Sequence, residues 1–309
     1  MSGLAILCPG QGAQHPEMFA LLAEHKAAAD VLKVGAGILD GDPAAVTRRI
    51  PAEGLFANAF AQPLICMAEM AMWFALRDSL PTPRVFAGYS VGELAAYGCS
   101  GALDAKQTLD LAVKRAALMD EASGAGHGLI AVRGMAAGRV EALCAHFGVE
   151  VAIVNGPDHF VVGGTTKNLL PLAERAAGCG AQTVRQLPID VASHTSAMAE
   201  AGSRYADALS AADFSDPPIP VLAGISGEVV RNRARAVKTL AQQLSHPLDW
   251  AACMESVIEM GCGVVLELGP GNALTRMFKE TFPGVRARAA EEFRSLRGVV
   301  DWVNKHCDD

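Results

Sequence analysis

The feature that most constrains the fold is a pentapeptide in the first third of the chain, Gly88-Tyr89-Ser90-Val91-Gly92. An apolar run at residues 84–87 precedes it, and a helix-compatible stretch with Glu93 in its first turn follows it. G-x-S-x-G between a strand and a helix is typical of a tight turn that exposes a serine hydroxyl at the carboxyl edge of a sheet. The glycines allow close approach of strand and helix. The sequence therefore predicts an α/β fold with Ser90 as a candidate nucleophile.

Short apolar runs alternate with helical stretches along the chain, which indicates a mainly parallel sheet with helices on both faces. The expected strands cover residues 4–8, 85–88, 128–132, 151–155, 159–163, 183–187, 221–224 and 264–268. The expected helices cover residues 63–79, 105–122, 135–147, 166–177, 195–210, 235–244, 251–260 and 272–282.

One segment, residues 126–190, has a different order of elements. It runs strand, helix, strand, strand, helix, strand, with a hairpin expected around Gly156-Pro157-Asp158. This order is the ferredoxin-like pattern. We therefore predict a ferredoxin-like small domain at 126–190, inserted into an α/β-hydrolase-like large domain made of residues 1–125 and 191–309.

Composition excludes several classes of protein. The 309 residues carry a net charge of −7, which argues against a nucleic-acid partner. We find no apolar run of bilayer-spanning length and no secretion signal, so we expect no membrane partner. The eight cysteines show no CxxC and no metal-ligand spacing, so we expect reduced thiols, no metal and a cytoplasmic location.

A nucleophilic serine needs a general base, and eight histidines compete for that role: His15, His25, His127, His146, His159, His194, His246 and His306. His194 stands out because it lies between the expected small domain and the next helix, where a loop can project into a cleft. The base also needs an acceptor on its other ring nitrogen. Asp249, Asp190 and Asp104 are candidates, and their spacing does not choose between them.

The loop after the first strand reads Cys8-Pro9-Gly10-Gln11-Gly12-Ala13-Gln14. It lacks the Gly-Lys-Ser/Thr of a phosphate-binding loop. Its backbone N–H groups lie at the same sheet edge as Ser90, where they could form an oxyanion hole with the N–H of Val91. An ordinary tight turn is the alternative.

Arg115 lies in a predicted helix with one apolar face, next to Lys114. Neighbouring residues on a helix point about 100° apart, so one of the two cations can be solvated while the other faces a cleft. A role in binding an anion and an ordinary solvated charge both remain open at this point.

Taken together, these blocks resemble the malonyl-CoA:acyl carrier protein transacylase family over nearly the whole length. The matching blocks are the Cys8-Pro9-Gly10-Gln11-Gly12-Ala13-Gln14 loop, Gly88-Tyr89-Ser90-Val91-Gly92-Glu93, Arg115 with Met119, Ser193-His194, His246-Pro247-Leu248-Asp249-Trp250 and Glu267-Leu268-Gly269-Pro270-Gly271.

The resemblance implies a role for each matching residue. Ser90 would accept the acyl group, with His194 as its base and a backbone carbonyl at the position of Asp249 as orienting group. The N–H groups of Gln11 and Val91 would form the oxyanion hole. The substrate-binding residues would be Arg115, which clasps a malonyl carboxylate, together with Met119, Gln11 and Tyr89.

Two residues depart from the family's usual pattern. Asp249 stands where the family often has an amide side chain, so a contribution of its carboxylate stays open, and Tyr89 stands where the fatty-acid enzymes usually have histidine. The stretch from Tyr89 to Tyr97 and the opening of the first loop at Cys8 look closer to the transacylase (epsilon) subunit of malonate decarboxylase. The resemblance thus implies transfer of malonyl from malonyl-CoA to the phosphopantetheine-type thiol of an acyl carrier protein, without a cofactor and with other malonate decarboxylase subunits as partners. The alternatives are a transacylase of fatty-acid or polyketide synthesis, a serine esterase or thioesterase, and an inactive carrier-docking subunit.

Overall fold

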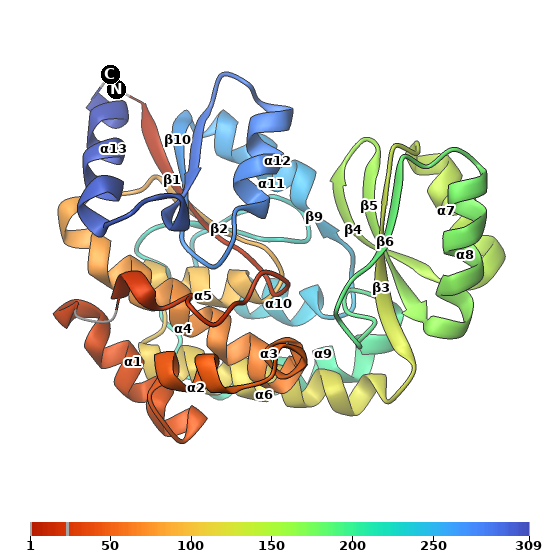
Figure 1. Ribbon diagram of the computed structural model, residues 1–309, viewed down its shortest axis with the longest axis horizontal. Coiled ribbons are helices and arrows are strands. Elements are labelled where there is room, and N and C mark those ends of the chain that lie inside the picture. Colours follow the sequence, from red (N-terminus) through yellow and green to blue (C-terminus); the bar gives the residue numbers. More distant parts are fainter. Residues whose placement is uncertain (1, 23–24, 309) are drawn as a thin grey trace.

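The computed structural model describes residues 2–22 and 25–308 and arranges them in two sheets covered by helices (Figure 1). The strands are β1 (Gly3–Cys8), β2 (Val85–Gly88), β3 (His127–Arg133), β4 (Glu150–Gly156), β5 (His159–Thr165), β6 (Thr183–Gln186), β7 (Val221–Leu222), β8 (Val229–Val230), β9 (Leu248–Asp249), β10 (Cys262–Glu267) and β11 (Arg286–Ala289). The α-helices are α1 (Lys26–Leu39), α2 (Pro43–Arg49), α3 (Ala52–Phe56), α4 (Asn58–Leu76), α5 (Val91–Ser100), α6 (Ala105–Ser123), α7 (Ala137–Phe147), α8 (Thr166–Gly178), α9 (Ala199–Ala211), α10 (Arg233–Gln243), α11 (Trp250–Glu259), α12 (Ala273–Thr281) and α13 (Leu296–Asp308). Short 3₁₀ turns lie at Ala20–Leu22, Arg77–Ser79, Ser196–Met198 and Ala290–Glu292.

The larger sheet has the strand order β11-β10-β1-β2-β7-β8, and only its last pair, β7 with β8, is antiparallel. Strand β1 is buried throughout, and its side chains alternate between two cores, as the two-residue period of a strand requires. Leu4 and Ile6 pack in the core that holds α4 and α5, whereas Ala5 and Leu7 pack in the core of α11 and α12. The prediction of a mainly parallel sheet covered on both faces is confirmed.

Helix α4 runs through the centre of the helical layer in Figure 1. With the following 3₁₀ turn, it is long and apolar enough to cross a membrane, contrary to the expectation that the chain has no apolar run of that length. However, 78% of its most apolar window is buried inside the protein. Trp73 meets Phe86 of β2 edge-to-face, with ring centroids 5.1 Å apart. The apolar composition of α4 is therefore explained by its place in the core.

The smaller sheet has the order β6-β3-β5-β4-β9, and its first four strands are antiparallel. This is the ferredoxin-like topology predicted from the order of elements. Helices α7 and α8 cover the outer face (Figure 1). The opposite face places Leu129 and Ile153 in the core of α11, and β9 extends β4 in parallel. The fold class is thus confirmed, while the boundaries at residues 125/126 and 190/191 stay a prediction.

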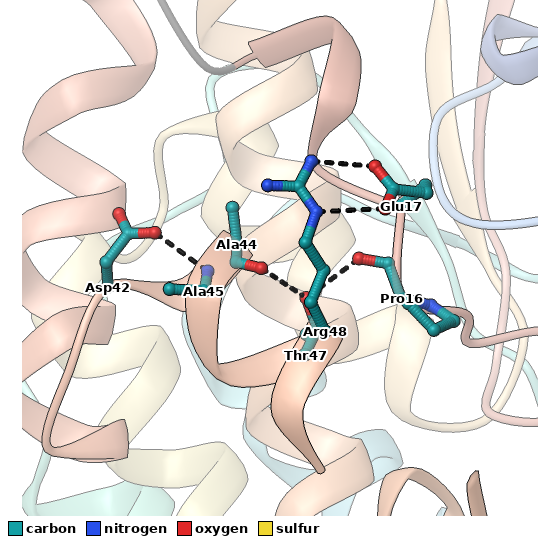
Figure 2. Close-up of polar contacts among 7 residues, drawn as sticks. All are labelled: Pro16, Glu17, Asp42, Ala44, Ala45, Thr47 and Arg48. Atoms are coloured by element: carbon teal, nitrogen blue, oxygen red, sulfur yellow. Dashed lines mark hydrogen bonds and ion pairs between the residues drawn. The ribbon is translucent and has the colours of Figure 1, made fainter. Parts of the chain in front are cut away.

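Helix α2 anchors the chain just beyond the first loop (Figure 2). The Thr47 hydroxyl donates to the carbonyl of Pro16 at 3.0 Å, and Arg48 forms two hydrogen bonds of 2.9 and 2.7 Å with the Glu17 carboxylate. Asp42 caps the helix by accepting from the N–H of Ala45 at 2.9 Å. These contacts fix the position of Pro16 and Glu17, in the segment that follows the Gln11 loop.

Candidate active site

Ser90 stands on a strained turn at the carboxyl end of β2, immediately before α5. Its φ of 57° and ψ of −119° lie outside the ordinary regions for a residue with a side chain. A Cβ on Gly88 would lie 2.1 Å from the Glu93 nitrogen, and a Cβ on Gly92 would lie 2.1 Å from the Cys8 carbonyl oxygen. Only glycine therefore fits at either flank, as the motif predicted.

The imidazole of His194 reaches Ser90 from the loop before α9. The Ser90 Oγ lies 2.9 Å from Nε2, and Nδ1 lies 2.6 Å from the carbonyl oxygen of Gln243. Because a carbonyl only accepts, Nδ1 carries the hydrogen and Nε2 is free to accept from the serine hydroxyl. Burial, and next the charge of Arg115, lower the pKa of His194 to about 3, against an opposing effect of the Gln243 carbonyl. His194 is thus a neutral base.

The predicted orienting position at Asp249 is wrong. Its carboxylate accepts from the N–H of Ala252 at 2.9 Å and caps α11. The orienting group is instead the carbonyl of Gln243, the last residue of α10, and such terminal carbonyls have no partner within their own helix. Asp104 is likewise engaged elsewhere, as the N-cap of α6.

Arg115 is almost completely buried, with 2% of its surface exposed. It donates to Gln62 Oε1 at 2.8 Å and to Gln243 Oε1 at 2.9 Å, and its Nη2 lies 3.4 Å from Ser90 Oγ. Among the described residues, no carboxylate forms a salt bridge with it. Burial lowers its pKa. The site therefore holds a desolvated guanidinium that faces neutral oxygens, beside the candidate nucleophile.

Two amide side chains hold Arg115 in place, and neither was predicted from the sequence. Gln62 donates to Met119 Sδ at 3.5 Å and to Asn58 Oδ1 at 2.6 Å, which leaves its oxygen for Arg115. Gln243 donates through Nε2 to the Glu93 carboxylate at 2.5 Å. Polar residues on the buried faces of α4 and α10 were the available signal, because a buried amide needs partners.

The first loop lies directly against the serine turn. Strands β1 and β2 pair with Cys8 opposite Gly88, so both chains leave the sheet at the same edge. A Cβ on Gly10 would lie 2.9 Å from the Tyr89 carbonyl oxygen. Within the part of the chain that the structure describes, the backbone N–H groups of Gln11 and Val91 have no hydrogen-bond partner.

Tyr89 points from the turn towards the small sheet. Its hydroxyl donates to Asn155 Oδ1 at 3.1 Å, and its ring meets Trp250 edge-to-face, with centroids 5.4 Å apart. Burial raises its pKa, so the phenol stays protonated. Tyr89 therefore contributes a ring to the site while its hydroxyl is engaged elsewhere.

These residues share one cavity between the two sheets. The small domain contributes an apolar wall, and the large domain contributes the reactive groups. The lining residues are Gly10, Gln11, Gln62, Tyr89, Ser90, Arg115, Met119, Leu129, Ile153, Leu187, Ile189, Val191, Ser193 and His194. Within the described ranges, no group of three or more His, Cys, Asp or Glu could hold a metal ion.

A serine–histidine pair in an α/β fold, beside a buried cation, defines an enzyme of acyl transfer chemistry. The model of the acyl transferase domain family matches residues 6–292, so the chain belongs to this family and is an acyltransferase. The malonyl CoA-acyl carrier protein transacylase of Mycobacterium bovis is 31% identical, over 93% of this chain and 96% of that protein. The Bacillus subtilis protein of the same name is 28% identical over the full length of both.

Solved structures agree with the family assignment. The malonyl-transacylase in the PlMCAT:AntF (holo) complex, where it is bound to a type II PKS acyl-carrier protein, matches with a TM-score of 0.92 and 27% identity, covering 97% of this chain and 99% of that one. The MCAT of Mycobacterium tuberculosis matches with a TM-score of 0.88 and 30% identity, covering 96% and 99%. The two-sheet architecture is therefore that of the malonyl transacylases.

Proposed function

We propose that the protein transfers a malonyl group from malonyl-CoA to the thiol of an acyl carrier protein through a malonyl ester of Ser90. The observation that carries this proposal is the buried guanidinium of Arg115, which lies 3.4 Å from Ser90 Oγ and has no carboxylate partner among the residues that the structure describes. A malonyl group brings the missing carboxylate, which a guanidinium can bind through two parallel hydrogen bonds. An ordinary esterase does not need a buried cation beside its nucleophile, because its substrate has no free carboxylate to bind.

In the first half-reaction, Ser90 Oγ attacks the thioester carbonyl while His194 Nε2 takes its proton. The negative charge on the carbonyl oxygen is stabilised by the N–H groups of Gln11 and Val91, and each such donor contributes about 3–4 kcal/mol in other acyl-transfer enzymes. The tetrahedral adduct then expels the CoA thiolate, which receives the proton from His194. A malonyl ester of Ser90 remains.

In the second half-reaction, the carrier thiol gives its proton to His194 and attacks the ester. The adduct collapses, Ser90 Oγ leaves with the proton from His194, and malonyl is left on the carrier as a thioester. Arg115 holds the ester carboxylate throughout and so fixes the carbonyl against the oxyanion donors. The chemistry requires no metal or redox cofactor.

The names of the relatives give an acyl carrier protein as acceptor and, in one complex, a type II PKS acyl-carrier protein, which supports the alternative of a carrier of fatty-acid or polyketide synthesis. None of these relatives is named for malonate decarboxylase. The carrier of malonate decarboxylase, which Tyr89 and Cys8 led us to expect, therefore stays a prediction, and the experiment below tests it as one of two acceptors. The cytoplasmic location likewise remains a proposal.

Mass spectrometry of the intact protein after brief mixing with malonyl-CoA tests the proposal. Wild type should gain one malonyl mass and lose it on addition of a carrier with its phosphopantetheine arm, whereas Ser90→Ala should gain none. Carriers of the two kinds, offered separately, identify the acceptor. Loss of the adduct to water at the same rate with and without a carrier would make the protein an esterase. An adduct on Ser90→Ala would overturn the assignment of the nucleophile.

A further inference from the structure

Behind Arg115 lies a carboxylate that the mechanism does not use. Glu93, in the first turn of α5, is completely buried and lies three residues beyond the nucleophile. One oxygen, Oε2, accepts from the N–H of Gly224 at 2.9 Å and from Gln243 Nε2 at 2.5 Å. The other oxygen, Oε1, is buried without a partner in the part of the chain described. A desolvated carboxyl group in such a place needs an explanation.

The amide of Gln243 has two different ends, and its neighbours determine which way each end must face. Arg115 can only donate, so it requires the oxygen of the amide, at 2.9 Å. The nitrogen of the amide then faces the opposite side, where it requires an acceptor. Glu93 supplies that acceptor and makes the reverse orientation unfavourable, because a reversed amide would place N–H groups against the guanidinium and oxygen against the carboxylate.

Gln243 also connects this network to the base. Its backbone carbonyl accepts from His194 Nδ1 at 2.6 Å, and the next carbonyl, of Leu244, accepts from the backbone N–H of His194 at 2.8 Å. His194 itself has a φ of 63°, a conformation that neighbouring contacts must hold. The side chain of Gln243 thus fixes Arg115 while its backbone fixes His194.

We infer that Glu93 is a positioning residue for acyl selectivity: by accepting from Gln243 Nε2 it fixes the amide oxygen on Arg115 and so aligns the guanidinium for a carboxylate beside Ser90. This inference rests on the proposed function and deepens it. What Glu93 contributes is a hydrogen-bond acceptor beside Gln243 Nε2. A glutamine at position 93 can supply the same acceptor, whereas a methionine of similar length cannot.

The test is the ratio of Ser90 acylation rates with malonyl-CoA and with acetyl-CoA, whose acyl group has no carboxylate. Glu93→Met should lower this ratio about tenfold, the scale of coupling between contacting residues, and Glu93→Gln should keep it within about threefold. Gln243→Met keeps the backbone carbonyl for His194 and removes only the side chain, so it should also lower the ratio about tenfold. Its acetyl-CoA rate should fall less than its malonyl-CoA rate.

The double variant Glu93→Met/Gln243→Met identifies the route of the effect. If Glu93 acts only through the amide, the double variant should lose about tenfold, like either single variant, rather than about a hundredfold. Equal losses with the two substrates, a Glu93→Gln as impaired as Glu93→Met, or a multiplicative double variant would each overturn the inference. If Glu93→Met does not fold, the Gln243→Met ratio and the Glu93→Gln value decide. Wild type that is not acylated by malonyl-CoA counts against the proposed function instead.

Discussion

Replacing Arg115 is the perturbation that best separates a malonyl transferase from an esterase. Arg115→Ala removes the N–H groups that donate to Gln62 Oε1 and Gln243 Oε1. It also leaves a malonyl carboxylate without a partner in a buried cavity. Truncating one side of a buried charge pair costs about 2–5 kcal/mol. At 1.4 kcal/mol for each factor of ten, kcat/KM for malonyl-CoA should fall roughly 30- to 4,000-fold.

The same change should act differently on acetyl-CoA. Its acyl group has no carboxylate to bind, and the charge of Arg115 is the second cause, after burial, that lowers the pKa of His194. Removing that charge makes His194 a stronger base at Ser90. The acetyl-CoA rate of Arg115→Ala should therefore stay constant or rise, so that the malonyl to acetyl ratio falls mainly because the malonyl rate falls.

The assay is kcat/KM for both substrates on purified wild type, Arg115→Ala and Arg115→Lys. The lysine variant keeps the charge and loses the two-pronged geometry, so its malonyl rate should fall between the other two. Melting temperatures serve as the control, because both variants leave buried amide oxygens with fewer donors. An equal loss for both substrates in a folded Arg115→Ala would refute the reasoning and assign Arg115 a structural role.

Two further predictions concern the base, His194, and a buried carboxyl group, Glu69. His194→Ala should slow acylation and transfer by about 100-fold or more, while His127→Ala and His159→Ala, whose residues do not line the cavity, should stay near wild type; an equal loss in either control would reassign the base. Glu69 is fully buried, and neither of its carboxyl oxygens has a partner among the described residues. Burial raises the pKa of Glu69 well above its ordinary value of 4.5. The contribution of Glu69 to stability is therefore fully present below pH 4.5 and is lost as the pH rises towards the raised pKa of the folded state. Urea unfolding between pH 5.5 and 7.5 should accordingly show a free energy of unfolding that falls more steeply with pH in wild type than in Glu69→Gln, by at most about 1.4 kcal/mol per pH unit, and parallel slopes would contradict this explanation.

The elements that determine the nucleophile and the two-sheet fold could be predicted because their signals are local. G-x-S-x-G needs only a strand before it and a helix after it, and the order of elements at 126–190 defines its own sheet. Strand β11 and the two-residue strands β8 and β9 were not predicted, because their pairing depends on neighbours far away in sequence. Helices α1, α2, α3 and α13 were also missed.

The residue that orients His194 could not be predicted for a different reason. The orienting group is a backbone carbonyl, as the resemblance implied, but the identity of a side chain carries no information about which carbonyl remains unpaired at a helix end. The resemblance placed this carbonyl at Asp249, whose side chain caps α11, whereas it belongs to Gln243. The partners of Arg115 are uncharged, so a search for charged pairs in the sequence also passes over Gln62 and Gln243.

In the proposed mechanism, selectivity for malonyl follows from the fact that no carboxylate in the described part of the chain lies directly against Arg115. If Glu93 contacted Arg115 itself, the pair would be stable and a malonyl carboxylate would have to displace it. One amide between them keeps the carboxyl group at a distance: burial raises the pKa of Glu93 to about 7, with the charge of Arg115 only the last of the opposing causes. Burial of Arg115 and of Glu93 each costs desolvation energy that a direct ion pair between them would have offset. The malonyl carboxylate would give Arg115 the negative partner that it lacks, so the desolvation of Arg115 favours binding of malonyl and not of acetyl.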